Sequence, residues 1–69
     1  MEKSALMKRI IIDPNVMVGK PIIKGTRIPV IVVMEALTEG MTMEQIIEEY
    51  QLTKEDILAC LAFAAYFFA

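Results

Sequence analysis

The chain has too few metal-binding and sulfur-bearing side chains for several kinds of site. Its 69 residues include one cysteine and no histidine. A disulfide within the chain needs two cysteines, and a typical zinc site draws on cysteine and histidine ligands, so both are excluded. We predict no catalytic residues, no metal and no cofactor. Cys60, among apolar neighbours, is expected to be a reduced, buried thiol.

The chain also lacks a hydrophobic run long enough to cross a bilayer. The longest run, residues 57–69, has 13 residues, whereas a transmembrane helix needs about 20. Lys8 and Arg9 break the apolar stretch near the N-terminus, which is unlike a signal peptide. A cytoplasmic protein without a membrane partner is therefore expected.

Basic side chains are scarce in the second part of the sequence. Residues 1–27 carry a net charge of +4, and residues 28–69 carry −6 with Lys54 as their one base. The whole chain is acidic, with a net charge of −2, which does not support a dominant role in binding polyanions. The asymmetry can direct partner choice or assembly. The alternative interpretation is a solvated surface on both parts.

Apolar residues, by contrast, are abundant. They make up 57% of the chain, above the usual range of roughly 45–50%. A single small domain, residues 1–69, buries a small fraction of its surface, and oligomerisation is the remaining remedy when disulfides and metals are excluded. We therefore predict a homodimer.

Conformationally special residues gather in the stretch that precedes the predicted helices. Gly19 and Gly25 can adopt left-handed backbone angles without steric cost. Pro21 suits the start of an edge strand. Thr26 offers a hydroxyl that can cap a helix, and Pro29 suits a first helical turn. We interpret this stretch as a structural turn between a β segment and a helical body.

The pattern of apolar residues and turn signals predicts a β ribbon followed by three helices. Val30–Val33 have strand propensity, but Met34–Leu37 favour helix and Gly40 is a typical helix stop, so we choose a helix. Thr42 with Gln45 forms a predicted capping box. The predicted segments are a flexible start at 1–8, a ribbon and loop at 9–28 that pairs 10–12 with 21–23, and a three-helix core at 29–69 with helices at 29–39, 43–50 and 54–68.

The last two predicted helices have the spacing of a helix-turn-helix, and Thr53 is the predicted cap of the second. The predicted fold class is mostly α: a three-helix, homeodomain-like core, preceded by a short β ribbon, in a dimer. A recognition helix needs side chains that reach base edges, yet no charged or amide side chain follows Asp56. We therefore interpret the last helix as an association helix. Its candidate dimer contacts are Leu58, Leu61, Phe63, Phe67 and Phe68.

Several motifs resemble one known family. They are Ile11 to Val30 (IIDPNVMVGKPIIKGTRIPV), Gly40, Ile46 to Tyr50 (IIEEY), Leu52-Thr53 with Asp56-Ile57, and Leu61 to Tyr66 (LAFAAY). In these motifs the chain resembles the prokaryotic family named domain of unknown function 433. The resemblance implies a dimeric homeodomain-like fold, no established catalytic activity, and an antitoxin-like role beside PIN-like nuclease toxins. The ending Tyr66-Phe67-Phe68-Ala69 departs from relatives that continue with polar residues, which raises the expectation of a shortened chain.

The residues expected to contact a partner or DNA are Lys20, Lys24 and Arg27. The leading hypothesis is a non-enzymatic, antitoxin-like homodimer that blocks a PIN-like nuclease, whose acidic active site these cations would neutralise. The alternative function is a DNA-binding transcriptional regulator that uses the basic ribbon. A purely structural alternative leaves both lysines solvated and pairs Arg27 with Glu35 or Glu39.

Overall fold

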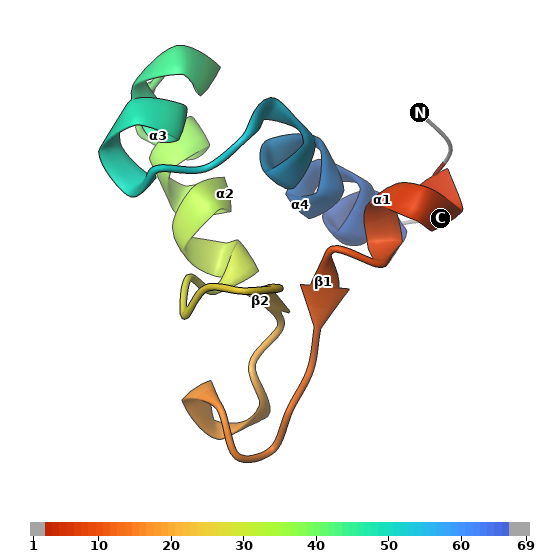
Figure 1. The fold of residues 1–69 in the computed structure, drawn as a ribbon. Helices are drawn as coiled ribbons and strands as arrows, with labels where there is room; N and C mark the ends of the chain where they lie inside the picture. The colour runs from red at the N-terminus through yellow and green to blue at the C-terminus, as the bar shows by residue number, and fades with distance from the viewer. Residues whose placement is uncertain (1–2, 67–69) are drawn as a thin grey trace.

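The computed structural model describes residues 3–66 and is mostly helical (Figure 1). A short two-stranded antiparallel ribbon accompanies the helices, which confirms the predicted class at this level. In chain order the elements are α1 (Lys3–Met7), β1 (Ile10–Ile11), the 3₁₀ turn η1 (Met17–Gly19), β2 (Ile22–Ile23), α2 (Val30–Thr38), α3 (Met43–Tyr50) and α4 (Lys54–Tyr66).

Side-chain caps define the starts of α3 and α4, as the sequence predicted. The Gln45 N–H donates to Thr42 Oγ1 at 3.1 Å, and the Thr42 N–H donates to Gln45 Oε1 at 2.8 Å. The same reciprocal pair occurs between Thr53 and Asp56, at 3.1 and 3.0 Å. Because each box satisfies two backbone donors, these helices start at defined residues.

α2 confirms the choice of a helix over a strand for residues that have β propensity. It starts after Pro29, whose backbone is extended. Its C-cap is Glu39, and Gly40, with φ +96°, is the first residue beyond it. The Met41 N–H donates to the Ala36 carbonyl and the Gly40 N–H to the Leu37 carbonyl. This pair of bonds forms a Schellman motif, in which glycine supplies the left-handed residue.

The hydrophobic core is organised around α4, which contacts α1, α2, α3 and β1. Val33 from α2, Ile46 from α3 and Ile57 from α4 are completely buried, and Cys60 lies in the same cluster. Ile23 of β2 joins this cluster and so attaches the ribbon to the helices. No polar or charged residue is buried within the described part of the chain.

The flexible start predicted for residues 1–8 requires correction, since Lys3–Met7 form α1. This helix packs against α4 (Figure 1) and buries Leu6. A helix of five residues is not stable in isolation. Its stability comes from the contact with α4, which lies far away in the sequence, and local patterns therefore do not reveal it.

The ribbon is shorter than predicted and gains a third segment. Ile10 pairs with Ile23 and Ile11 with Ile22, so that the paired residues are 10–11 and 22–23. The chain then turns back, and the Val30 N–H donates to the Pro21 carbonyl at 2.9 Å. Extra backbone pairing and burial of Ile22 and Ile23 compensate for the marginal stability of a two-stranded ribbon.

Candidate interaction surface

Residues 12–18, which we call the apolar loop, connect the two strands through an unusual turn. An Asx turn starts it, in which the Asn15 N–H donates to Asp13 Oδ1 at 2.9 Å. Met17, Val18 and Gly19 then have φ values of 51°, 57° and 77°. Positive φ is a genuine outlier for a β-branched residue such as valine. Backbone bonds hold the turn, from the Gly19 N–H to the Val16 carbonyl and from the Lys20 N–H to the Met17 carbonyl.

This turn directs apolar side chains of the loop into solvent. Val18 is 93% exposed and Ile12 is 59% exposed, and Met17 is also exposed. In Figure 1 the loop, drawn in orange, extends away from the helices. The loop therefore forms a protruding apolar surface that no other part of the described chain covers.

Residues 24–27, which we call the basic loop, are closed by a threonine. Thr26 Oγ1 donates to the Ile23 carbonyl at 2.7 Å and accepts from the Ile28 N–H at 3.0 Å. Gly25 supplies a left-handed residue with φ +82°. The prediction that Thr26 caps a helix is therefore wrong, because its hydroxyl is used inside the loop and Pro29 is the cap of α2.

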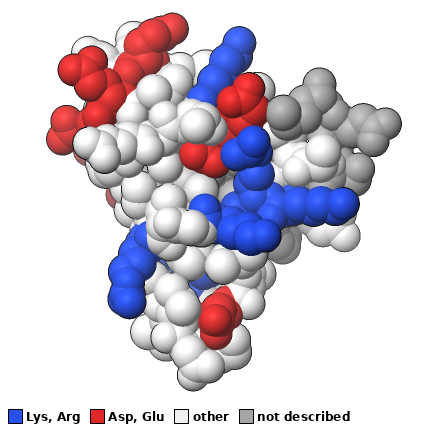
Figure 2. Space-filling view, in the orientation of Figure 1, with Lys and Arg blue, Asp and Glu red and all other residues white. Residues whose placement is uncertain are grey.

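The three basic candidates remain unpaired on the surface. Lys20, Lys24 and Arg27 are exposed, and within residues 3–66 none of them forms an ion pair. The alternative in which Arg27 pairs with Glu35 or Glu39 does not occur in the structure. Figure 2 shows basic side chains over the middle and lower parts of one face and acidic side chains over α3.

The ion pair that does form between described residues is Arg9 with Asp56, at 3.2 Å. Asp56 is 14% exposed and also caps α4, so one carboxylate joins the start of β1 to the start of α4. From the sequence, Asp56 stood out only as part of a family motif and as the last charged residue of the chain. The 47-residue separation leaves no local pattern that would reveal the pair.

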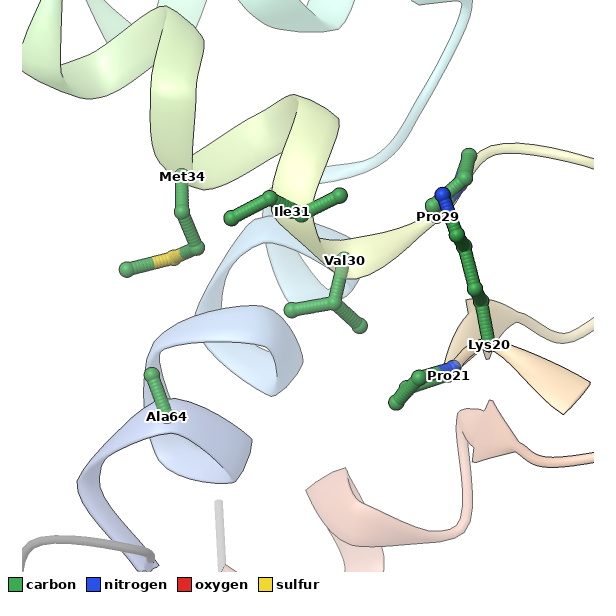
Figure 3. A pocket seen from close by; sticks show the side chains of 7 residues that line it. All are labelled: Lys20, Pro21, Pro29, Val30, Ile31, Met34 and Ala64. Atoms are coloured by element: carbon green, nitrogen blue, oxygen red, sulfur yellow. The ribbon is translucent and has the colours of Figure 1, made fainter.

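A shallow apolar groove lies beside Lys20 (Figure 3). Its volume is about 430 Å³. The side chains come from the segment before β2, the start of α2 and the last turns of α4, and Lys20 is the one charged residue among them. They are Lys20, Pro21, Pro29, Val30, Ile31, Met34 and Ala64. The groove could not be predicted from the sequence, because three segments that are distant in the chain form it.

The predicted dimer contacts on α4 have different environments. Leu58 and Phe63 are half-buried, and Phe63 packs against the core. Leu61 is 38% exposed and lies on the same helix face as Ala64, three residues later. Phe67 and Phe68 lie outside the described residues. α1 also packs against α4, and the cover of α4 by a second chain stays a prediction.

The cysteine and the acidic side chains of the described residues form neither a reactive thiol site nor a metal site. Burial, and secondarily the negative charge of Asp56, raise the pKa of the Cys60 thiol to about 12, so the thiol stays protonated at neutral pH. Between residues 3 and 66, no three acidic or cysteine side chains meet in a metal-binding arrangement. None of the described helices combines the length and apolar content needed to span a bilayer.

Comparison with known proteins places the chain in a family. The family model described as protein of unknown function (DUF433) matches residues 10–64. The chain belongs to this family. The matched range contains the ribbon, both loops and α2 and α3 complete, so the groove and the three unpaired cations are all part of the DUF433 domain.

One protein is similar to this chain in sequence, and another is similar in structure. An uncharacterised protein of Archaeoglobus fulgidus is 71% identical over 24 residues, which are 35% of this chain and 67% of that protein. A DUF433 member protein from Anabaena variabilis, known from a crystal structure, is 30% identical with a TM-score of 0.81. That similarity covers 91% of this chain, which spans only 63% of the Anabaena chain.

Proposed function

We propose that this DUF433 protein is a non-enzymatic, homodimeric interaction module of the antitoxin kind, which binds and blocks a PIN-like nuclease. The observation that carries the proposal is the set of three exposed cations without ion pairs, Lys20, Lys24 and Arg27. Lys20 is part of the lining of the apolar groove, so that charge and apolar surface meet at this residue. Protein interfaces typically have this composition, with arginine enriched among their residues.

The basic loop is suited to reach an acidic active site. Thr26 and Gly25 fix its backbone, so Lys24 and Arg27 project from a preorganised support. Preorganisation reduces the entropy lost on binding. A nuclease site that holds a divalent metal through carboxylates offers the partners that a guanidinium binds in bidentate fashion. In the proposed mechanism, Arg27 occupies that site and Lys24 pairs at its edge.

Co-purification with the nuclease encoded beside this gene tests the proposal. Arg27→Ala should weaken binding by about 10- to 100-fold, the effect of losing one charge-assisted hydrogen bond. Lys54→Ala is the matched control, because Lys54 is equally exposed but lies at the start of α4. Failure of two well-folded proteins to bind, or equal losses for the two variants, would overturn the proposal.

DNA binding is the second candidate function, and it rests on the same fixed, basic loop. Two copies would present six such cations, whereas α4 starts with the acids Glu55 and Asp56 and is unsuited to phosphate. A mobility-shift titration on the protein's own promoter across salt concentrations tests it. Lys24→Ala with Arg27→Ala should flatten the salt dependence. The absence of any shift at low salt would eliminate this function.

A further inference from the structure

We propose that the apolar loop of one copy docks in the apolar groove of a second copy, and that the two copies exchange these contacts reciprocally. The inference rests on the homodimer in the proposed function and identifies the surfaces that form it. It makes the loop and the groove two parts of one self-complementary interface, whereas the basic loop remains available to another partner.

The loop has the features of a segment built for contact. Three successive residues in the left-handed region cost free energy, and each non-glycine residue contributes about 1–2 kcal/mol. Strain of this kind persists where other interactions offset it. Backbone hydrogen bonds hold the turn, but the Val18 side chain makes almost no contacts within its own chain, because 93% of the residue is exposed. Burial against a second molecule would supply the missing interactions.

The groove has matching chemistry. Ile31, at its edge, is 52% exposed, and Met34 offers a flexible side chain that adapts to an inserted group. In Figure 3, Val30, Ile31 and Met34 from α2 and Ala64 from α4 surround the opening opposite Pro21. The groove volume of about 430 Å³ is enough for several aliphatic side chains.

The loop does not fill the groove of its own chain. None of residues 12–18 is among the residues that line it. Yet the loop is attached directly at the groove, since Lys20 follows the left-handed turn and forms part of the lining. When a projecting segment lies beside its receptor, a two-fold axis allows each copy to place its loop in the other. Such an interface is closed and produces a dimer.

Charge supports the same pairing. Asp13 is the one charged residue of the apolar loop, and Lys20 is the one charged residue of the groove. They have opposite signs, and Lys20 forms no ion pair within the described chain. Docking would bring Asp13 of each loop toward Lys20 of the other copy, which favours this orientation over a reversed one.

A dimer of this kind needs to cover only a small part of the chain's surface. A stable interface buries about 800 Å² per partner, which is roughly one sixth of the 4818 Å² surface of this chain. Reciprocal exchange contributes one loop and one groove from each copy. Leu61, on the same face of α4 as Ala64, extends the apolar surface beyond the groove.

Mixed cysteine variants test the contact directly. A chain with Val18→Cys is mixed with a chain with Met34→Cys and treated with a short bismaleimide. We expect a crosslinked dimer on a denaturing gel. The native Cys60 is buried and protonated, so it stays unreactive. Glu44→Cys, on the exposed face of α3, replaces Met34→Cys in the control and should give no dimer.

Sedimentation equilibrium separates this inference from the proposed function. Val18→Asp should raise the dissociation constant of the dimer by more than about tenfold, with an unchanged circular dichroism spectrum. Gln51→Asp adds the same charge at an exposed site at the end of α3, outside the loop and the groove lining, and should leave the dimer intact. Asp13→Lys and Lys20→Asp should each weaken the dimer, and their combination should restore it.

The outcomes are distinguishable. A monomeric wild-type chain would overturn the homodimer, and the docking with it. A wild-type dimer that Val18→Asp leaves unchanged, or that gives no crosslink between the mixed variants, would overturn the docking alone. Loss of nuclease binding in a chain that still crosslinks would count against the proposed function and leave the docking in place.

Discussion

The helical body and the apolar loop use the same kinds of side chain in opposite ways. Val33 and Ile57 in the body are completely buried, whereas Val18 and Ile12 in the loop are largely exposed. In the body, helical periodicity turns every third or fourth residue toward the core. In the loop, a left-handed turn directs the side chains outward. The exposure of Met17 and Val18 thus follows from the backbone of the turn.

The comparison shows that the two regions contribute to different equilibria. Burial of apolar surface stabilises by about 25 cal/mol per Å², and the body obtains this stabilisation when the chain folds. The loop obtains it only when a second molecule covers the exposed side chains. Substitutions in the body should therefore change the free energy of unfolding, and substitutions in the loop should change association.

The largest effect should come from Ile57→Ala. Removal of this completely buried side chain creates a cavity and should lower the free energy of unfolding by about 2–5 kcal/mol. Ile12→Ala, the matched truncation in the exposed loop, should change it by less than about 0.5 kcal/mol. Urea denaturation of both variants at low protein concentration measures the difference. Equal losses would contradict the division between body and loop.

The second effect concerns the carboxylate that joins the ribbon to the body. Asp56→Ala removes the Asp56 half of the α4 capping box and the Arg9 ion pair and should cost about 1–2 kcal/mol. Arg9→Ala should cost less, about 0.2–1 kcal/mol, because its side chain is 40% exposed. A double-mutant cycle from thermal unfolding gives the coupling between them. A coupling energy of zero would show that the cap alone accounts for the role of Asp56.

The local caps of the helices could be predicted from the sequence, whereas the long-range contacts of the body could not. The capping boxes at Thr42 and Thr53 and the stop at Gly40 depend on residues within six positions of one another, and all were predictable. The packing of α1 on α4 and the Arg9–Asp56 pair depend on residues about 50 positions apart. Local propensity carries no information about such contacts.

The candidate interaction surface also has a part that single residues reveal and a part that depends on residues far apart in the chain. Lys20, Lys24 and Arg27 could be selected from the sequence because charge is a property of single residues. The groove could not, since Pro21, Ile31 and Ala64 are unremarkable until the fold brings them together. The left-handed geometry of Val18 was also unpredictable, because valine disfavours it.

A pH titration probes the body through its buried thiol. Burial raises the pKa of the Cys60 thiol to about 12 from its ordinary value of 9.0. Above pH 9 the unfolded chain releases this proton while the folded chain retains it, so stability falls as pH rises. The slope should be about 1.4 kcal/mol per pH unit between pH 9 and 12. Cys60→Ala should lose this component, and identical slopes for the two proteins in urea denaturation would contradict it.

The smallest effects compare the two left-handed sites directly. Gln51, at the end of α3, has φ 54°, close to the 57° of Val18. Glycine relieves the strain at either site, and after its entropic cost the net gain in stability should be about 0.5–1 kcal/mol. Gln51→Gly should therefore stabilise the chain and leave its association unchanged, because Gln51 belongs to the body. Val18→Gly should stabilise the monomer by a similar amount yet weaken the dimer, since the side chain that docks is lost. Chemical denaturation measures the stability of both variants, and sedimentation measures the dissociation constants of their dimers. Equal dissociation constants would mean that the geometry of Val18 serves the turn alone.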